Sequence, residues 1–336
     1  MRALLMAGLV LAGCASAPPG PASPAIIERR VMLMGTSLEI EVEAADRAAA
    51  LAASEDAVKA LESAERRLST WRTDTELARL NQTPAGERLD LSPALAADLA
   101  AARGCWRETD GAFDPGLGAL VRAWGLRTGG RRPGEAERRE AMETGGMAGL
   151  RLEGDSAVRV KPGLLLEEGG FGKGAGLADA LSALAASGVT RAALDLGGQV
   201  AVLGGGWTVP VADPRERDHA VLELSIDGGS VSTSGNGERG IVVDGRRLGH
   251  ILDPRTGEPA PDFGSLTVWT ADPLWADCLS TGLYVLGPER ALAWAAGHPG
   301  VEVLVLKMEG EELRALASPG LRGRLKTLDP RVKMVP

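Results

Sequence analysis

The segment Leu248-Gly249-His250-Ile251-Leu252-Asp253-Pro254-Arg255-Thr256-Gly257 sets a histidine at the end of a predicted strand, directly before a rigid turn. Asp253 can cap the turn through its carboxylate, Pro254 fixes the backbone φ angle at the second position, and Gly257 lets the chain leave. His250 is one of 3 histidines in the chain, and histidine is the side chain best suited to proton transfer near neutral pH. On its own, the segment suits a structural histidine before a surface turn as well as a chemical one.

The first residues resemble the start of a secreted lipoprotein. An apolar run from Ala3 to Ala12 is too short to span a bilayer and suits the apolar core of a secretory signal. Small residues then lead to Cys14, as in a lipoprotein processing site whose cysteine becomes the lipidated first residue; the alternative is an uncleaved apolar start with an incidental cysteine. We expect residues 1–13 to be a signal peptide, residues 14–25 a lipidated cysteine with a Pro/Ala-rich tether, and residues 26–336 the folded domain.

The composition fits one large domain or two intimately packed lobes. Of the 336 residues, 44% are hydrophobic and 24% charged, which is enough to bury a sizeable core. The net charge of −8 comes without a long block of one sign, so no nucleic-acid surface is expected, because phosphate binding needs clustered Lys and Arg. Beyond Cys14, only Cys105 and Cys278 remain, and the sequence leaves open whether they pair or stay as free thiols.

Hydrophobic periodicity predicts helices and strands that do not alternate strictly along the chain. Residues 129–149 are Gly-rich and charge-dense, and we expect them to form a surface insertion. This mixture favours an α+β fold, with antiparallel sheets and flanking helices, over a doubly wound sheet. Helices are expected over residues 46–68, 92–108, 175–187, 276–286 and 289–296. Strands are expected over residues 31–42, 266–270 and 301–307, and over 192–196, 199–203, 207–211, 221–226 and 230–233 as an antiparallel meander.

A glycine cluster, Gly169-Gly170-Phe171-Gly172-Lys173-Gly174, opens one predicted helix. It lacks the Ser or Thr that follows Gly-Lys in a P-loop, and it contains no Gly-x-Gly-x-x-Gly after a strand. Backbone N–H groups at a glycine-rich helix start can approach an anion closely, and Lys173 adds a positive charge. The cluster therefore suits either an anion site or a tight turn with a solvated lysine.

Asp277 and Thr281 lie four residues apart on another predicted helix, which puts a carboxylate and a hydroxyl on one face. Such oxygen ligands suit a hard cation such as Mg²⁺, although a helix-start Asp with a back-bonded Thr has the same pattern. The chain contains no Gly-x-Ser-x-Gly, no His-x-x-x-His and no Cys-x-x-Cys. Serine hydrolase, zinc protease and dithiol redox chemistry therefore lack their usual motifs.

Taken in order, the motifs along the chain after residue 25 resemble the ApbE family of flavin transferases, which move FMN from FAD to a protein hydroxyl. The motifs are Met34-Gly35-Thr36, Leu68-Ser69-Thr70-Trp71 with Glu76-Leu77 and Asn81, Gly111-Ala112-Phe113-Asp114-Pro115, the glycine cluster, Asp195-Leu196-Gly197-Gly198, Thr233-Ser234-Gly235-Asn236 with Glu238-Arg239, His250 to Gly257, and Ala276-Asp277 with Thr281. The resemblance implies two closely packed lobes that form one ApbE-like catalytic unit.

The resemblance also implies site residues. Catalysis falls to His250, as the base, and to Asp277. A Mg²⁺ ion would be held by Asp277, Thr281 and a backbone oxygen near Gly170. The positions that match FAD-contacting residues are Met34, Trp71, Ala112, Phe113, Asp114, Glu167, Lys173, His250 and Ile251.

The reaction implied is Mg²⁺-dependent transfer of FMN from FAD to a Thr or Ser hydroxyl of an acceptor protein, with release of AMP. A divalent ion offsets phosphate charge and a base deprotonates the hydroxyl in such chemistry. Three alternatives remain: a FAD pyrophosphatase that releases FMN and AMP, a non-catalytic flavin-binding lipoprotein, and a plain periplasmic scaffold lipoprotein.

Several positions depart from the family's pattern. Glu167 stands where the family usually has Asp, so the acidic contact comes from a longer side chain. Ala175 and Ala178 replace an aromatic and an Asp, with Asp179 one step later, and Gly237 replaces another aromatic. These departures bear on FAD affinity more than on reaction type.

The lipoprotein start and the resemblance together predict the location and the partners. We expect a periplasm-facing lipoprotein of the bacterial cell envelope, anchored through Cys14 in the outer or inner membrane. The acceptor would be a membrane redox-complex subunit or a periplasmic flavoprotein.

Overall fold

The computed structural model describes residues 24–237, 240–243 and 245–335. The predicted signal peptide, Cys14 and the tether up to residue 23 lie outside this part of the chain, as do Glu238 and Arg239 of the quoted motif. Among the helices that are described, none combines the length and the apolar character needed to cross a bilayer.

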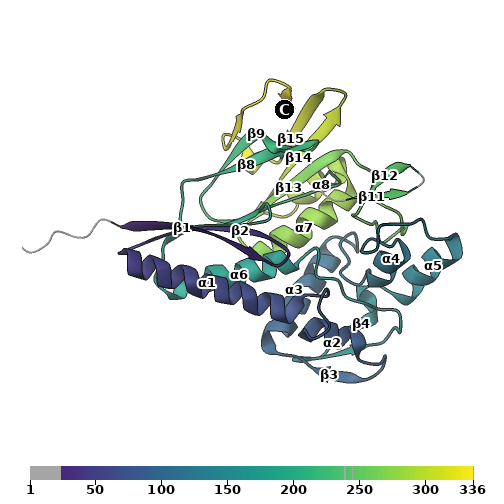
Figure 1. The fold of residues 1–336 in the computed structure, drawn as a ribbon. Helices are drawn as coiled ribbons and strands as arrows, with labels where there is room; N and C mark the ends of the chain where they lie inside the picture. Colours follow the sequence, from purple (N-terminus) through teal and green to yellow (C-terminus); the bar gives the residue numbers. More distant parts are fainter. Residues whose placement is uncertain (1–23, 238–239, 244, 336) are drawn as a thin grey trace, which may run out of the picture.

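Nine strands of the described chain form one sheet, in the order β1-β2-β6-β7-β10-β13-β14-β15-β17. Figure 1 labels β1, β2, β13, β14 and β15 of this sheet. The pairings are antiparallel, except that β15 and β17 run parallel. The strands are β1 (Ala25–Leu33), β2 (Thr36–Ala44), β6 (Arg191–Leu196), β7 (Gln199–Leu203), β10 (Gly229–Gly235), β13 (Gly264–Thr270), β14 (Val301–Glu309), β15 (Glu312–Ala317) and β17 (Val332–Met334).

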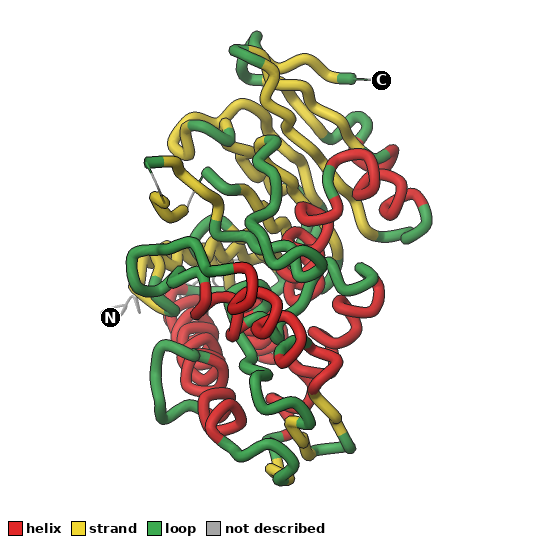
Figure 2. The backbone as a smooth tube through the Cα atoms, turned by 90° about the vertical axis from the view of Figure 1, so that its right-hand side faces the viewer, coloured by secondary structure: helices red, strands yellow, loops and turns green. Residues whose placement is uncertain are grey.

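Helices flank this sheet, and Figure 2 shows most of them gathered in the lower part of the molecule, with most strands above. They are α1 (Arg47–Leu68), α2 (Glu76–Gln82), α3 (Pro93–Glu108), α4 (Gly118–Ala123), α5 (Glu135–Thr144), α6 (Gly172–Ala186), α7 (Pro273–Leu286) and α8 (Pro288–Ala296). The predicted α+β class, with antiparallel sheets and flanking helices, is confirmed.

The first core lies between the sheet and helices α1 and α6. Leu38 of β2 and Leu194 of β6 are fully buried in one apolar cluster with Leu61 of α1 and Leu184 of α6. Inward-facing residues recur every second position on the strands and every three to four on the helices, so both patterns direct apolar side chains to this layer. The packing fixes α6, whose first turn reaches the candidate site.

The strand expected over residues 31–42 is in fact a hairpin. Met34 and Gly35 both have positive φ angles, of 50° and 72°, and reverse the chain between β1 and β2. A two-residue loop with this geometry matches the twist of antiparallel strands, which is why the alternating pattern continued across it. A left-handed backbone at a non-glycine residue is costly and is often found at functional sites.

The meander expected between residues 192 and 233 is partly wrong. β6, β7 and β10 pair in the large sheet, but β8 (Trp207–Asp213) and β9 (Glu216–Ile226) leave it and form a smaller sheet with β16 (Leu325–Thr327). The partner strand comes from the far end of the sequence, and local periodicity cannot specify such a pairing. A second small sheet joins β3 (Arg88–Asp90), β5 (Ser156–Arg159) and β4 (Leu150–Leu152), and β11 (Gly240–Val243) pairs with β12 (Arg246–Gly249).

The helix prediction at residues 92–108 is confirmed, with Ser92 as the N-cap, accepting a hydrogen bond from the N–H of Leu95, and Pro93 in the first turn. One other prediction needs correction: helix α6 begins at Gly172, within the glycine cluster and ahead of Ala175. The predicted surface insertion at residues 129–149 contains helix α5, which is largely exposed.

Cys105 of α3 and Cys278 of α7 form a disulfide, with Cα atoms 6.3 Å apart. Both residues are fully buried, so the bond lies inside the core that joins the two helices. The question that the sequence left open is thereby answered within the structure. The bond is adjacent in sequence to Asp277.

Candidate active site

A cavity of about 670 Å³ lies beside the start of α6 and one face of α7, and every predicted site residue lines it. It is formed by segments that are far apart in sequence, from the β1–β2 turn to the middle of α7. The predicted residues at its wall are Met34, Trp71, Ala112, Phe113, Asp114, Glu167, Gly170, Lys173, His250, Ile251, Asp277 and Thr281. The structure thus brings them together, while their individual roles stay predictions.

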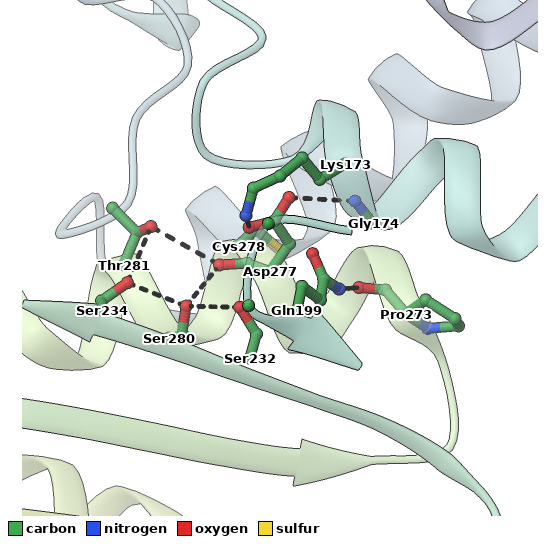
Figure 3. A network of polar contacts seen from close by, with 12 residues as sticks. Lys173, Gly174, Gln199, Ser232, Ser234, Pro273, Asp277, Cys278, Ser280 and Thr281 are labelled. Carbon is green, nitrogen blue, oxygen red and sulfur yellow. Dashed lines mark hydrogen bonds and ion pairs between the residues drawn. The ribbon is translucent and has the colours of Figure 1, made fainter. Parts of the chain in front are cut away.

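Asp277 connects α7 to the first turn of α6 (Figure 3). Its Oδ2 accepts a hydrogen bond from the backbone N–H of Gly174 at 3.0 Å, and its Oδ1 lies 3.6 Å from Nζ of Lys173. The Asp277 side chain is only 5% exposed, whereas that of Lys173 is 32% exposed. A buried carboxylate and a half-exposed ammonium therefore face the cavity as a pair.

Hydroxyl groups on the sheet side hold the backbone of Asp277 through Ser280 (Figure 3). The hydroxyl of Ser280 donates to the backbone carbonyl of Asp277 at 2.8 Å and lies 2.9 Å from Oγ of Ser234. Oγ of Ser234 also lies 3.4 Å from Oγ1 of Thr281. Ser280 is not identifiable from the sequence, because a serine inside a helix carries no spacing signal of its own.

The donor set fits a hard cation. Asp277 offers a carboxylate and Thr281 a hydroxyl, and a Cβ added at Gly170 would lie 3.4 Å from Oγ1 of Thr281, so the backbone at Gly170 is close to Thr281. Oxygen ligands are those that Mg²⁺ prefers, usually with retained waters and substrate phosphates. Within the described residues, no three His, Cys, Asp or Glu side chains form a metal-binding cluster. A cation here would therefore depend on one carboxylate plus neutral oxygens.

His250 follows β12 directly and lines the cavity with a half-buried side chain. The turn after it is held at several points. The Asp253 carboxylate accepts from the Arg255 backbone N–H at 2.9 Å and from its guanidinium at 2.8 and 2.7 Å. Burial opposes ionisation of Asp253, but these hydrogen bonds outweigh it and hold its pKa below the usual value. The indole N–H of Trp124 donates to the Gly257 carbonyl at 2.7 Å, so the turn is fixed to α4.

Asp114 occupies the turn after the buried pair Ala112 and Phe113. Its Oδ1 accepts from the backbone N–H of Gly116 at 2.7 Å and of Met147 at 2.8 Å. Burial raises the pKa of Asp114 to about 6, although these hydrogen bonds pull it down. The carboxylate therefore shapes the cavity wall by binding backbone groups.

The positions that depart from the family's pattern have structural roles in this chain. Asp179 pairs at 2.8 Å with Arg67, which also binds Asp98 at 2.7 Å, so the displaced acid joins α6 to α1 and α3. A Cβ at Gly237 would lie 2.3 Å from the Pro214 carbonyl oxygen, which leaves no room for an aromatic side chain there. Ala175 is buried in the core.

A model of the ApbE family matches residues 34–305. The chain belongs to the ApbE family. Among curated family relatives, the FAD:protein FMN transferase of Klebsiella pneumoniae (strain 342) is 30% identical over 338 residues, covering 95% of each chain. That of Rhodobacter capsulatus is 32% identical over 339 residues, covering 97% of this chain and 63% of the relative.

Solved ApbE structures have the same fold. The flavin transferase ApbE from Vibrio cholerae superposes with a TM-score of 0.79 at 26% identity, covering 90% of this chain and 100% of the other. The ApbE protein from Thermotoga maritima gives 0.81 at 27% identity, covering 89% and 99%. The resemblance drawn from the motifs is confirmed, and with it the assignment of this ApbE chain to the transferase class of enzymes.

Proposed function

We propose that this ApbE chain is a Mg²⁺-dependent FAD:protein FMN transferase that modifies a Thr or Ser hydroxyl and releases AMP. The observation that carries the proposal is the meeting of Lys173, Asp277 and Thr281 with His250 at one cavity. An ammonium, a carboxylate and a hydroxyl group beside a histidine suit the transfer of a phosphorus-centred group. The relatives named as FAD:protein FMN transferases support the same reaction.

In this reaction the acceptor oxygen forms a bond to the FMN phosphorus, and the bond from that phosphorus to the bridging pyrophosphate oxygen breaks. AMP leaves with the bridging oxygen. His250 takes the proton of the acceptor hydroxyl as general base. Lys173 supplies a positive charge next to the pyrophosphate, and Asp277 with Thr281 would hold Mg²⁺, which offsets phosphate charge when bound.

The cavity wall would select the flavin dinucleotide. Phe113 and Met34 supply apolar surface, and Trp71 adds an indole that is 68% exposed. Flat aromatic surfaces suit stacking against planar ring systems such as isoalloxazine or adenine. The backbone at Gly170 and Gly172 leaves the first turn of α6 open to the cavity.

Product analysis separates the transferase from its alternatives. Purified chain is incubated with FAD and Mg²⁺, with and without an acceptor domain, and AMP and free FMN are measured by chromatography. A transferase releases AMP only when acceptor is present; equal AMP and FMN without acceptor would indicate a FAD pyrophosphatase. Tight FAD binding without any AMP would indicate a non-catalytic flavin-binding protein.

A matched pair of histidine variants tests the proposed role of His250 as general base. His250→Ala should abolish AMP release while FAD still binds. His219→Ala serves as the control, because His219 pairs with Asp329 at 2.8 Å and does not line the cavity. Unchanged turnover in His250→Ala would remove His250 from its proposed role.

We also propose that the chain works at the periplasmic face of a bacterial membrane, anchored through Cys14, on a membrane redox-complex subunit or a periplasmic flavoprotein. The support is the sequence before residue 25. Expression of the full chain with a Cys14→Ala control, followed by membrane fractionation, tests the anchor. Recovery of both proteins in the soluble periplasmic fraction would contradict it.

A further inference from the structure

Arg127 lies in the loop after α4 and connects this loop to two other segments that line the cavity, although its own side chain does not line it. One segment is the loop after α1, which carries Thr70 and Trp71. Another is the stretch before α6, which carries Glu167 and Glu168. Neither the motifs nor their spacing drew attention to this arginine.

The Arg127 guanidinium makes polar contacts with both segments. Nη1 donates to the backbone carbonyl of Thr70 at 3.0 Å, and Nη2 donates to Thr70 Oγ1 at 2.5 Å. Nη2 also forms an ion pair with Glu167, and Oε2 of Glu168 lies 4.0 Å away. The side chains of Arg127, Glu167 and Glu168 are 27%, 21% and 13% exposed, so these contacts are largely shielded from water.

The same guanidinium stacks on an indole. Cζ of Arg127 lies 4.3 Å from the centroid of the Trp71 ring. An arginine is suited to this double task, because its planar group can stack on an aromatic face while its N–H groups bind oxygen atoms in the plane. Trp71 is 68% exposed, so the guanidinium fixes a side chain that would otherwise sample several rotamers.

The ion pair also affects Glu167. Burial raises the pKa of Glu167, and the charge of Arg127 opposes that rise. Arg127 thereby favours the ionised form of a carboxylate at the cavity wall. Removal of the guanidinium would leave a largely shielded carboxylate without its cation, which favours its protonation or movement.

We propose that Arg127 is a positioning residue that holds Trp71 and Glu167 in place for the flavin dinucleotide and so sets its affinity. This inference rests on the proposed function, because the ligand is FAD. Arg127 acts through its neighbours from outside the cavity wall. Its loss should therefore weaken FAD binding and leave the chemical step of the bound complex nearly unchanged.

The test compares the FAD dissociation constant, KM and kcat of Arg127→Ala, Arg127→Lys and a control. Loss of a stacked, charge-assisted contact should raise the dissociation constant and KM about tenfold, with kcat near that of the wild type. Arg127→Lys keeps the charge but loses the planar group, so its dissociation constant and KM for FAD should lie between those of the wild type and Arg127→Ala. The control is Arg131→Ala, since Arg131 belongs to the same loop, pairs with Glu137 and lies outside this cavity.

A double-mutant cycle distinguishes positioning from a general loss of structure. In a Trp71→Ala background, Arg127→Ala should weaken FAD binding by clearly less than it does in the wild type. If Arg127→Ala fails to fold by thermal melting, Arg127→Lys in the same two backgrounds provides the test. FAD affinity and KM unchanged in both arginine variants, or fully additive effects with Trp71→Ala, would overturn the inference. Absence of FAD binding by the wild type would overturn the proposed function together with it.

Discussion

Asp277 on α7 and Gly174 on α6 are joined by a hydrogen bond of 3.0 Å, from the Gly174 backbone N–H to Oδ2 of Asp277. The approach is close: a Cβ at Gly174 would lie 2.3 Å from the Pro273 carbonyl oxygen and 2.9 Å from Cβ of Asp277. Glycine is required here because the two helices touch backbone to backbone. The glycine cluster therefore works as a packing device that brings the start of α6 to the carboxylate.

Gly174→Ala should separate α6 from α7. We expect a loss of about 1–3 kcal/mol in the free energy of unfolding, as for other overpacked sites, and a large loss of FAD turnover. Urea denaturation and the AMP assay measure the two effects. Gly134→Ala is the control, because Gly134 has an ordinary φ of −67° and no atom within 4 Å of an added Cβ. Equal stability and turnover of Gly174→Ala and the wild type would contradict this packing role.

How far the sequence predicts the structure depends on the range of the interactions. Helix α3 was predicted within one residue at each end, because Ser92, Pro93 and the apolar periodicity are all local signals. The sequence predicts too late a start for α6, because Gly172 and Gly174 are typical of loops. Only the contact of Gly174 with α7 explains a glycine inside the helix. The pairing of β9 with β16 is not predictable from local patterns, because the paired residues near 222 and 327 are far apart in the sequence.

The candidate site shows the same division. Residues within ordered motifs, such as Lys173, His250 and Asp277, were predicted and do meet at one cavity. Arg127 and Ser280 were missed, because their importance comes from contacts with other segments. Such residues become visible only when the fold brings the segments together.

Asp277→Asn tests the proposed cation site. The amide oxygen can still accept the Gly174 N–H, so the fold should persist while the charge is lost. We expect AMP release to fall by about 100-fold or more, since a bound cation stabilises the transition state by several kcal/mol. The exposed Asp56→Asn variant is the control.

Removal of the metal ion provides a second test of Asp277 as a cation ligand. EDTA should abolish wild-type turnover, and Mg²⁺ should restore it. The residual turnover of Asp277→Asn should no longer respond to Mg²⁺ concentration over the range that activates the wild type. A variant with a wild-type response to Mg²⁺ would exclude Asp277 as a ligand.

Asp114 predicts a pH dependence of stability. Its pKa of about 6 in the folded chain exceeds the ordinary 3.8, so the folded state binds the proton more tightly than the unfolded chain. The contribution of this group to stability is therefore fully present below about pH 4 and is lost as the pH rises through about 6. Asp114→Asn keeps an oxygen that can accept the N–H groups of Gly116 and Met147.

The variant should therefore gain stability relative to the wild type as the pH rises from 4 to 7, on the order of 2 kcal/mol. Urea denaturation of both proteins at each pH measures the difference. A difference that stays constant across this range would show that the Asp114 carboxylate titrates normally in the folded chain.

The Cys105–Cys278 disulfide should stabilise the chain, because it closes a loop over a sequence separation of 173. The double variant Cys105→Ala/Cys278→Ala is expected to lose about 2–5 kcal/mol in the free energy of unfolding. Denaturant titration of the non-reduced proteins measures this loss. Alkylation after denaturation without reductant provides the check: labelled thiols at both positions would show that the bond is absent.

Transfer of FMN to a protein hydroxyl would change the intact mass of an acceptor protein. Purified chain, FAD and Mg²⁺ are incubated with acceptor domains that present a Thr, and with the same domains carrying Val at that position. We expect a mass gain of one FMN group on the Thr form alone, dependent on Mg²⁺ and absent with His250→Ala. FAD cleavage by the wild type without an adduct on any acceptor would contradict the proposed transfer.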